Sequence, residues 1–171
     1  MPVLQIFSCG GTIDKVYFDA KSTYEIGEPQ IVTVLREANV SFEYEVHSIL
    51  RKDSLDMNDE DRALVRARVE GSPGSRIVIT HGTDTMAQTG RALADIPGKT
   101  IVLTGAMEPA RFRVTDAIFN IGSAVAAAQT MPPGVYIAMN GRIFDARRVR
   151  KNVGAARFEE DGGEAEPAVT R

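Results

Sequence analysis

The sequence predicts an α/β domain built on a mostly parallel sheet, because short apolar runs alternate with helical patterns along the chain. Runs of this length that are rich in Val and Ile and bounded by turn residues are typical of strands buried on both faces. Strands that alternate with helices favour a parallel sheet with right-handed crossovers. We expect the strands in five runs: VLQIF (3–7), YEVHSIL (44–50), RIVIT (76–80), TIVLT (100–104) and VYIAM (135–139).

Helical patterns fill the gaps between these strands. The second of them starts with an Asn or Asp cap and acidic residues, which is typical of a helix N-terminus, and we expect Leu64 and Val65 to face inward from it. The fourth is rich in Ala and begins at Thr115 or Asp116. The expected helices cover about 30–38, 58–70, 84–95 and 114–129.

The composition is that of an ordinary globular protein. The 171 residues are 43% hydrophobic and 25% charged, with a net charge of -3. This charge argues against nucleic acid or an anionic membrane as a general partner, because both need a positive field. No apolar window approaches the length of a membrane span, and the N-terminus lacks the features of a signal peptide. Cys9 is the single cysteine and cannot form an internal disulfide, so we expect a cytoplasmic protein.

The chain changes character at two places. Residues 14–27 carry two tyrosines in a polar context and are long for a connector, so we expect a loop that covers a site. Residues 153–171 are acidic, rich in Gly and Ala, and nearly free of large apolar side chains. Such a segment cannot bury enough surface to order itself. We therefore predict one three-layer domain over residues 1–152 and a flexible acidic C-terminal tail over 153–171.

Polar residues that follow the expected strands are the candidates for a site. In a parallel sheet, ligands bind where the loops at the carboxyl ends of the strands converge. Residues far apart in the sequence are therefore expected to meet in one crevice, and these are Thr12, Ser54, Asp56, Thr83, Asp84 and Ala106.

The turn SCGGTID (8–14) is the most unusual of these loops. It lacks the GxxxxGK[ST] and GxGxxG patterns of phosphate-binding loops, so its glycines are expected to bring the backbone close to a small ligand. Thr12 then either caps the turn or serves as a nucleophile, and a nucleophilic hydroxyl needs a base. Tyr24 is one candidate, because the long segment 14–27 can swing it over Thr12.

A second candidate is a group in which Asp84 orients Lys151, and Lys151 activates the hydroxyl of Thr83. The remaining nucleophile or base candidates are weaker. His47 lies inside a strand-like run and Cys9 at the end of one, where such residues are more often structural, and the ring of His81 is expected to bond the neighbouring loop. No group of His, Cys, Asp and Glu has the spacing of a metal site.

Five ordered motifs together resemble the bacterial L-asparaginases in their short-chain form, which lacks the usual C-terminal domain. The motifs are GGTID (10–14), DSLDMND (53–59), THGTDTM (80–86), LTGAMEPAR (103–111) followed by TDAIFN (115–120), and MNGRIFDARRVRK (139–151). The resemblance implies the fold of the family's N-terminal domain, which is Rossmann/flavodoxin-like. It also implies hydrolysis of L-asparagine to aspartate and ammonia without a metal or an organic cofactor.

The resemblance also implies roles for individual residues. Thr12 matches the primary nucleophile and Tyr24 the tyrosine that assists it. The second catalytic group corresponds to Thr83, Asp84 and Lys151. The positions that match substrate-binding ones are Gly11, Ser54, Leu55, Gly82, Asp84 and Ala106, where Ser54 and Asp84 hold the α-carboxylate and α-amino groups and the carbonyl of Ala106 contacts the leaving amide.

Two departures from the family pattern modify these expectations. Long-chain relatives complete the site with a glutamate from the C-terminal domain of a neighbouring subunit, and the half-length chain is therefore expected to form a homodimer or a tetramer. Leu55 stands where long-chain relatives commonly have a glutamine, so low glutaminase activity is expected. The alternatives to an asparagine amidohydrolase are an asparagine- or aspartate-binding sensor and the amidase part of a complex that supplies ammonia to tRNA-bound substrates.

Overall fold

A six-stranded sheet forms the centre of the computed structural model, which describes residues 2–162. Its order is β4 (Tyr44–Lys52), β1 (Leu4–Gly10), β5 (Arg76–Thr80), β6 (Thr100–Thr104), β7 (Gly134–Met139) and β8 (Arg142–Asp145). The pairs from β4 through β7 are parallel, and β8 runs antiparallel to β7. The five parallel strands follow the flavodoxin-like order 2-1-3-4-5, so the predicted fold class is confirmed.

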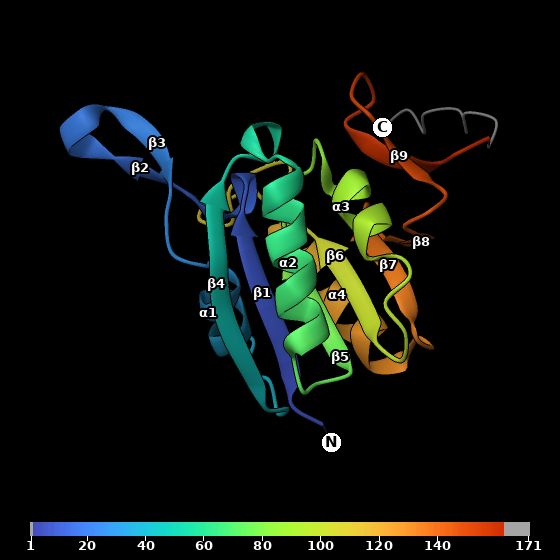
Figure 1. Cartoon of the computed structure of the whole chain (residues 1–171). Helices are drawn as coiled ribbons and strands as arrows, with labels where there is room; N and C mark the ends of the chain where they lie inside the picture. The colour runs from blue at the N-terminus through green and yellow to red at the C-terminus, as the bar shows by residue number, and fades with distance from the viewer. Residues whose placement is uncertain (1, 163–171) are drawn as a thin grey trace.

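Four helices cover the two faces of this sheet and make it the middle of three layers (Figure 1). They are α1 (Ile31–Glu37), α2 (Asp59–Gly71), α3 (Met86–Leu93) and α4 (Ala117–Thr130). One apolar cluster joins the sheet to α2 and α3, and a second joins the opposite face to α1 and α4. The change of face from α1 to α2 follows from the positions of β4 and β5 on opposite sides of β1. Helix α4 returns to the face of α1, although β7 continues the direction from β5 to β6. The connection β6–α4–β7 therefore has the opposite hand to the other three, and the expectation of uniformly right-handed crossovers is wrong there.

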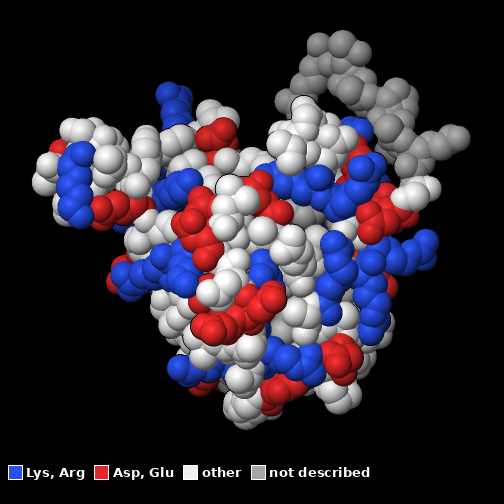
Figure 2. All heavy atoms as spheres, turned by 45° about the horizontal axis from the view of Figure 1, so that its top comes forward, with Lys and Arg blue, Asp and Glu red and all other residues white. Residues whose placement is uncertain are grey.

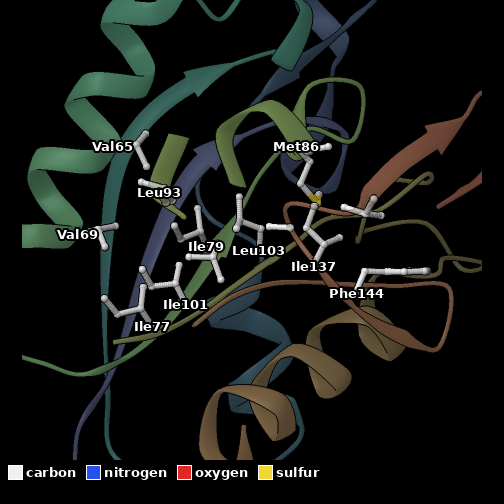
Figure 3. Packing of buried hydrophobic residues seen from close by; sticks show 14 of the residues in the cluster. Val65, Val69, Ile77, Ile79, Met86, Leu93, Ile101, Leu103, Ile137 and Phe144 are labelled. Carbon is white, nitrogen blue, oxygen red and sulfur yellow. The ribbon is translucent and has the colours of Figure 1, made fainter. Parts of the chain in front are cut away.

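The central strands are buried on both faces, as their continuous apolar runs predict. Along β5, Ile77 and Ile79 join the cluster under α2 and α3, whereas Val78 joins the cluster under α4. Figure 3 shows Ile77, Ile79, Ile101 and other apolar side chains of the first cluster packed together. Of the two residues expected to face inward from α2, Val65 is fully buried but Leu64 is 40% exposed, because neighbouring residues on a helix point about 100° apart.

Residues 14–27 form a hairpin instead of the expected irregular loop. Strand β2 (Lys15–Phe18) pairs antiparallel with β3 (Thr23–Ile26), and Tyr17 lies opposite Tyr24. The hairpin extends away from the main sheet (Figure 1). A four-residue strand with exposed aromatic side chains lacks the apolar signal of a buried strand, and the turn is tight because Ser22 adopts a positive φ of 51°.

Regular structure also continues past residue 152, where the sequence places the end of the domain. Strand β9 (Val149–Asn152) pairs antiparallel with β10 (Arg157–Glu160). Phe158 is 2% exposed and joins the cluster under α2 and α3, so one aromatic side chain anchors a stretch that is otherwise polar. The flexible tail expected from residue 153 therefore does not begin before Glu160, and residues 163–171 of that prediction lie outside the described residues.

Gly122 is an exposed position inside α4 where alanine is expected to stabilise the protein. A methyl group there would meet no atom within 4 Å, and alanine favours a helix over glycine by about 0.5–1 kcal/mol. Urea denaturation of Gly122→Ala should show that gain. In the matched variant Gly98→Ala, the methyl group is equally free of contacts but φ is +70°, so a loss of about 1 kcal/mol is expected. Equal midpoints for the two variants would contradict this account.

Candidate active site

The loops at the carboxyl ends of β1, β4, β5 and β6 converge at one end of the sheet, at the top of Figure 1. The strand order reverses between β1 and β5, so their carboxyl ends form the switch point where ligands bind in such folds. The loop after β1 begins at Gly11, and the loop after β5 begins at His81. Both loops belong to the predicted site.

The backbones of Gly11 and Gly82 touch at this switch point. A methyl group on Gly11 would lie 2.4 Å from the backbone nitrogen of Gly82, and one on Gly82 would lie 2.6 Å from Cβ of Ser54. Gly11 also has φ +87° and ψ -176°, a region that is essentially open to glycine alone. The loops after β1, β5 and β4 are therefore in direct contact through positions that exclude any side chain.

Thr12 begins a single 3-10 turn, Thr12–Asp14, directly after Gly11. Its side chain is partly buried. The turn is held by the bond from Asp14 N to the carbonyl oxygen of Gly11 and by a bond from Ala110 N to the carbonyl oxygen of Ile13 at 3.1 Å. The hydroxyl-bearing residue is thus presented by a rigid turn that contacts the loop after β6.

Lys151 on β9 joins Thr83 and Asp84, although almost seventy residues separate them in the sequence. Its Nζ donates to Oγ1 of Thr83 at 2.8 Å and to Oδ1 of Asp84 at 2.7 Å. Thr83 is 6% exposed, and the lysine side chain is 14% exposed. The hairpin β9–β10 therefore places a mostly buried amine in contact with a buried hydroxyl and with the carboxylate of Asp84, whose side chain is 36% exposed.

Ser54 is buried and connects the loop after β4 to the start of α3. Thr85 donates from Oγ1 to the carbonyl oxygen of Ser54 at 2.8 Å and from its backbone nitrogen to Oγ of Ser54 at 3.3 Å. The neighbouring Leu55 is 71% exposed. Ser54 lies among the converging loops, whereas Leu55 points to solvent beside them.

Ala106 lies in the loop after β6 and is 1% exposed. A methyl group on Gly105 would lie 2.3 Å from the carbonyl oxygen of His81, so this loop touches the loop after β5. The carboxylate of Asp116 holds the same loop by accepting bonds from the backbone nitrogens of Met107 and Glu108 at 3.0 and 3.1 Å. In the sequence, Asp116 is only a possible helix start, and no pattern there indicates that it holds this loop.

Tyr24, like Leu55, is a predicted site residue that the structure leaves exposed and apart from the others. Its ring is 52% exposed and packs edge-on against Tyr17 at 5.3 Å and Phe112 at 5.9 Å. The hairpin that carries it stands away from the sheet in Figure 1. Asp56, which was expected among the converging polar residues, is exposed at the end of the short turn Ser54–Asp56.

His81 is fully buried and bonds its own loop, as the sequence analysis expects. Nδ1 lies 2.7 Å from the carbonyl oxygen of Gly82, and Nε2 lies 2.8 Å from Oγ1 of Thr89. A carbonyl only accepts, so Nδ1 carries the proton and Nε2 accepts from the hydroxyl. Burial lowers the pKa of His81 to about 4, so the neutral ring fixes the peptide between Gly82 and Thr83.

Asp14 is a buried carboxylate that is not among the predicted site residues. It is 0% exposed and accepts from Oγ of Ser8 at 3.0 Å and from the backbone nitrogen of Gln30 at 2.8 Å. Burial raises the pKa of Asp14 to about 6, against the opposing effect of these two bonds. The only signal in the sequence is its position two residues after Thr12, where an Asp is equally typical of a solvated turn.

These two groups give the folded protein opposite dependences on pH. Between about pH 4 and 6.5 an unfolded histidine binds a proton that folded His81 does not, so this group lowers stability as the pH falls. Between about pH 3.8 and 6 folded Asp14 keeps a proton that an unfolded aspartate has lost, so this group raises stability as the pH falls. Each slope is about 1.4 kcal/mol per pH unit, and the two offset each other.

The variant Asp14→Asn removes the contribution of Asp14 to the pH dependence of the free energy of unfolding and leaves that of His81. Its free energy of unfolding is expected to fall more steeply than that of the wild type between pH 6 and pH 4.5, by about 1 kcal/mol per unit. Urea denaturation at a series of pH values measures this difference, and groups that titrate equally in both proteins cancel. Parallel curves over this range would show that Asp14 does not retain its proton in the folded state.

Other features of the described chain do not compete with this site. Within residues 2–162, no group of three or more His, Cys, Asp or Glu residues could hold a metal ion, and no helix is long and apolar enough to cross a membrane. A hollow of about 270 Å³ is lined by Gln5, Phe7, Glu45, His47 and residues near the end of α2. It lies along the starts of β1 and β4 rather than at their carboxyl ends.

Both signs of charge lie side by side on the face that includes the carboxyl end of the sheet (Figure 2). Two basic residues of the segment 142–151 lie beside acidic ones. Arg142 bonds Glu160 at 3.2 Å, and Arg150 lies 3.5 Å from Glu159. This face therefore presents a mixed surface, and the absence of a nucleic-acid partner stays a prediction.

Comparison with known proteins agrees with this geometry. The family model described as "Asparaginase, N-terminal" matches residues 3–159, which include all of the converging loops and the β9–β10 hairpin up to Glu159. The chain belongs to the asparaginase family. Within that family, it is 34% identical over 169 residues to the protein named "Probable L-asparaginase periplasmic" of Haemophilus influenzae, a match that covers 88% of this chain and 46% of the relative.

Two further relatives extend the comparison. The structure of the thermostable L-asparaginase from Thermococcus kodakarensis superposes with a TM-score of 0.81 at 30% identity, over 92% of this chain and 50% of that one. A "Glutaminase-asparaginase" of Acinetobacter glutaminasificans is 35% identical over 147 residues, covering 81% of this chain and 42% of the relative. This asparaginase-family chain therefore spans about half the length of the relatives it matches.

Proposed function

We propose that this protein is an L-asparagine amidohydrolase that uses a threonine nucleophile. The single observation that carries the proposal is the contact of Lys151 Nζ with Thr83 Oγ1 at 2.8 Å and Asp84 Oδ1 at 2.7 Å. An amine held between a hydroxyl and a carboxylate is the arrangement that general-base activation of a weak nucleophile needs. The Gly11 turn, which presents Thr12, completes the site.

The reaction divides into two steps. In the first, Oγ1 of Thr12 bonds to the amide carbon of asparagine, and its proton passes to the leaving nitrogen as the carbon–nitrogen bond breaks and ammonia departs. In the second, water adds to the resulting ester, aspartate leaves, and Thr12 regains its proton. The neutral amine of Lys151 takes the Thr12 proton through the Thr83 hydroxyl as the oxygen attacks, and returns it by the same route to the leaving nitrogen.

The substrate is a small zwitterion with one amide, and the converging loops offer a partner for each part. The carboxylate of Asp84 suits the α-ammonium group, and Ser54 suits the α-carboxylate. The carbonyl of Ala106 suits the leaving amide, and backbone nitrogens near Gly11 and Gly82 suit the developing oxyanion. Tyr24 assists Thr12 only after the hairpin β2–β3 closes over the site.

Glutamine is proposed to be a poor substrate. Leu55 offers no hydrogen bond to the polar atoms of a longer amide, and the cost of an unpaired polar group lowers its turnover. Steady-state ammonia release with each amide measures the ratio. Glutamine turnover equal to asparagine turnover would show that this chain behaves as the name of its Acinetobacter relative suggests.

A homodimer or tetramer in the cytoplasm remains part of the proposal. Its basis is the hairpin β2–β3, which stands away from the sheet and leaves surface to be covered. Analytical ultracentrifugation of the active protein tests the assembly, and full activity as a monomer contradicts it.

Ammonia release from asparagine by the purified chain is the experiment that tests the function. The variants Thr12→Ala and Thr83→Ala are each expected to lose at least about 100-fold in kcat, and Gly122→Ala serves as a folded control. Calorimetric binding of aspartate without any ammonia release would instead favour the sensor. Full rates in both threonine variants would refute the nucleophile assignments.

A further inference from the structure

We infer that Asp14 is a positioning residue for the proposed reaction, because its carboxylate ties the turn that presents Thr12 to the base of the hairpin that carries Tyr24. The inference rests on the proposed function for its kinetic part. It also makes a claim about the hairpin alone, which can be measured without any turnover. The hydrogen-bond partners of the Asp14 side chain are Ser8 and Gln30, and neither is a substrate-binding position named above, so its effect is through Thr12 and the hairpin.

The carboxylate joins three segments. One oxygen accepts from Ser8 on β1 at 3.0 Å, and the other accepts from the backbone nitrogen of Gln30 at 2.8 Å. Asp14 itself ends the turn that Thr12 begins. The strand before the turn, the turn, and the chain that returns from the hairpin are therefore held by one side chain.

The backbone of the same residue holds the base of the hairpin. Its carbonyl oxygen accepts from the nitrogen of Gly27 at 2.8 Å, next to the first cross-strand pair of Lys15 with Ile26. The side chain of Gln30 is fixed in turn, because its Oε1 accepts from Nε of Arg111 at 3.0 Å. The base of the hairpin is thus attached to the body of the protein around residue 14. Further along the hairpin, Nζ of Lys15 lies 3.6 Å from Oδ2 of Asp53 and the ring of Tyr24 packs against Phe112.

Loss of the carboxylate leaves specific groups without partners. In Asp14→Ala, the hydroxyl of Ser8 and the backbone nitrogen of Gln30 lose their acceptor in a buried place, which favours a rearrangement of the turn and of the hairpin base. In Asp14→Asn, the side-chain oxygen still accepts from Gln30, and the amide nitrogen donates to Oγ of Ser8. Asparagine therefore preserves the links while removing the charge.

The groups around Asp14 determine the pH at which its carboxyl group becomes charged. Burial raises the pKa of Asp14 to about 6, Arg51 on β4 lowers it, and Glu28 before α1 raises it. On β1, the thiol of Cys9 has a pKa raised to about 12, by burial first and by Asp14 second. Arg111 reaches the cluster through Gln30. Asp14 thus gains its charge as the pH rises through about 6, and its two bonds strengthen with that charge.

Kinetics of Asp14→Ala and Asp14→Asn test the inference, with Val69→Ala as the control. Val69 is fully buried in the cluster under α2 and α3, so its variant lowers stability without touching the site. At pH 8 we expect Asp14→Ala to lose about 10- to 100-fold in kcat and to raise KM, since a small displacement of a nucleophile has effects of this size. Asp14→Asn should recover most of the rate and lose the inflection near pH 6 that the wild type shows.

Limited trypsin digestion gives the readout that does not need activity. Lys15 and Lys21 lie on the hairpin, and the Lys21 side chain is 62% exposed. Cleavage at these two residues should be at least about fivefold faster in Asp14→Ala than in the wild type, Asp14→Asn and Val69→Ala, because a two-stranded hairpin is marginal without its anchor. Unchanged cleavage, or kinetic losses no larger than those of Val69→Ala, would overturn the inference. A wild-type protein that releases no ammonia would overturn the proposed function, while the cleavage rates would still decide this inference.

Discussion

Gly11→Ala is expected to lose at least about 100-fold in asparagine turnover and about 3–5 kcal/mol in free energy of unfolding. Two separate effects add. The backbone at φ +87° and ψ -176° is one that an L side chain rarely adopts, and the added methyl group would lie 2.4 Å from the nitrogen of Gly82. The atoms that the methyl group would meet belong to the backbone of His81 and Gly82, so they cannot give way as a flexible side chain can. The loops after β1 and β5 must then separate, which moves Thr12 away from Thr83.

Urea denaturation and ammonia release on the same preparation measure the two losses. Gly98→Ala is the matched control, since it shares a positive φ but has open space around the methyl group. That control should keep its activity and lose only about 1 kcal/mol. Equal losses of turnover and of free energy of unfolding in the two variants would mean that backbone strain alone, and not the contact between the two loops, makes alanine unfavourable at position 11.

Lys151→Met is expected to lower kcat by about 10²- to 10⁴-fold, the range typical for removal of a general base. Methionine has a similar length but can neither donate to Thr83 and Asp84 nor accept a proton. Lys151→Arg should be equally inactive, because a guanidinium keeps its charge in proteins and cannot serve as a base. Circular dichroism and thermal unfolding check that both variants are folded.

Arg148→Met is the control for Lys151. Arg148 lies three residues earlier and is exposed, so its loss removes a positive charge near the site without removing the bond to Thr83. Its kcat should stay within about twofold of the wild type. Substantial activity in Lys151→Arg would contradict the role as a base and leave Lys151 a structural partner of Asp84.

The main sheet and its helices were predictable because buried strands and buried helix faces require apolar residues at characteristic spacings in the sequence. A strand buried on both faces, such as β5 or β6, is a nearly continuous apolar run, and a glycine- or polar-rich loop follows each of them. The expected burial on both faces was wrong for β4, which is an edge strand and is partly exposed along its length. The convergence of these loops follows from the parallel arrangement. The contacts of Gly11 with Gly82 and of Gly82 with Ser54 agree with that expectation.

The two hairpins were not predictable by the same reasoning. Strands β2 and β9 are each four residues long and partly exposed, so alternation is too brief to separate them from loops. The burial of Phe158 depends on residues of α3 and the sheet that are distant in sequence. The burial of Asp14 was not predictable for a similar reason. The local sequence Gly-Gly-Thr-Ile-Asp is the same whether the carboxylate faces water or bonds Ser8 and Gln30.

By itself, the sequence determined the layered α/β fold, the end of the sheet at which a site forms, and the residue types available there. Only the tertiary structure decided that Lys151 reaches Thr83, that Tyr24 lies apart from them, and that Asp14 is buried. The physical reason is the distance along the chain over which each property is set. Local patterns of apolar residues determine which faces of a strand or helix are buried. A bond between residues almost seventy positions apart, or the burial of one carboxylate, depends on how separate segments pack.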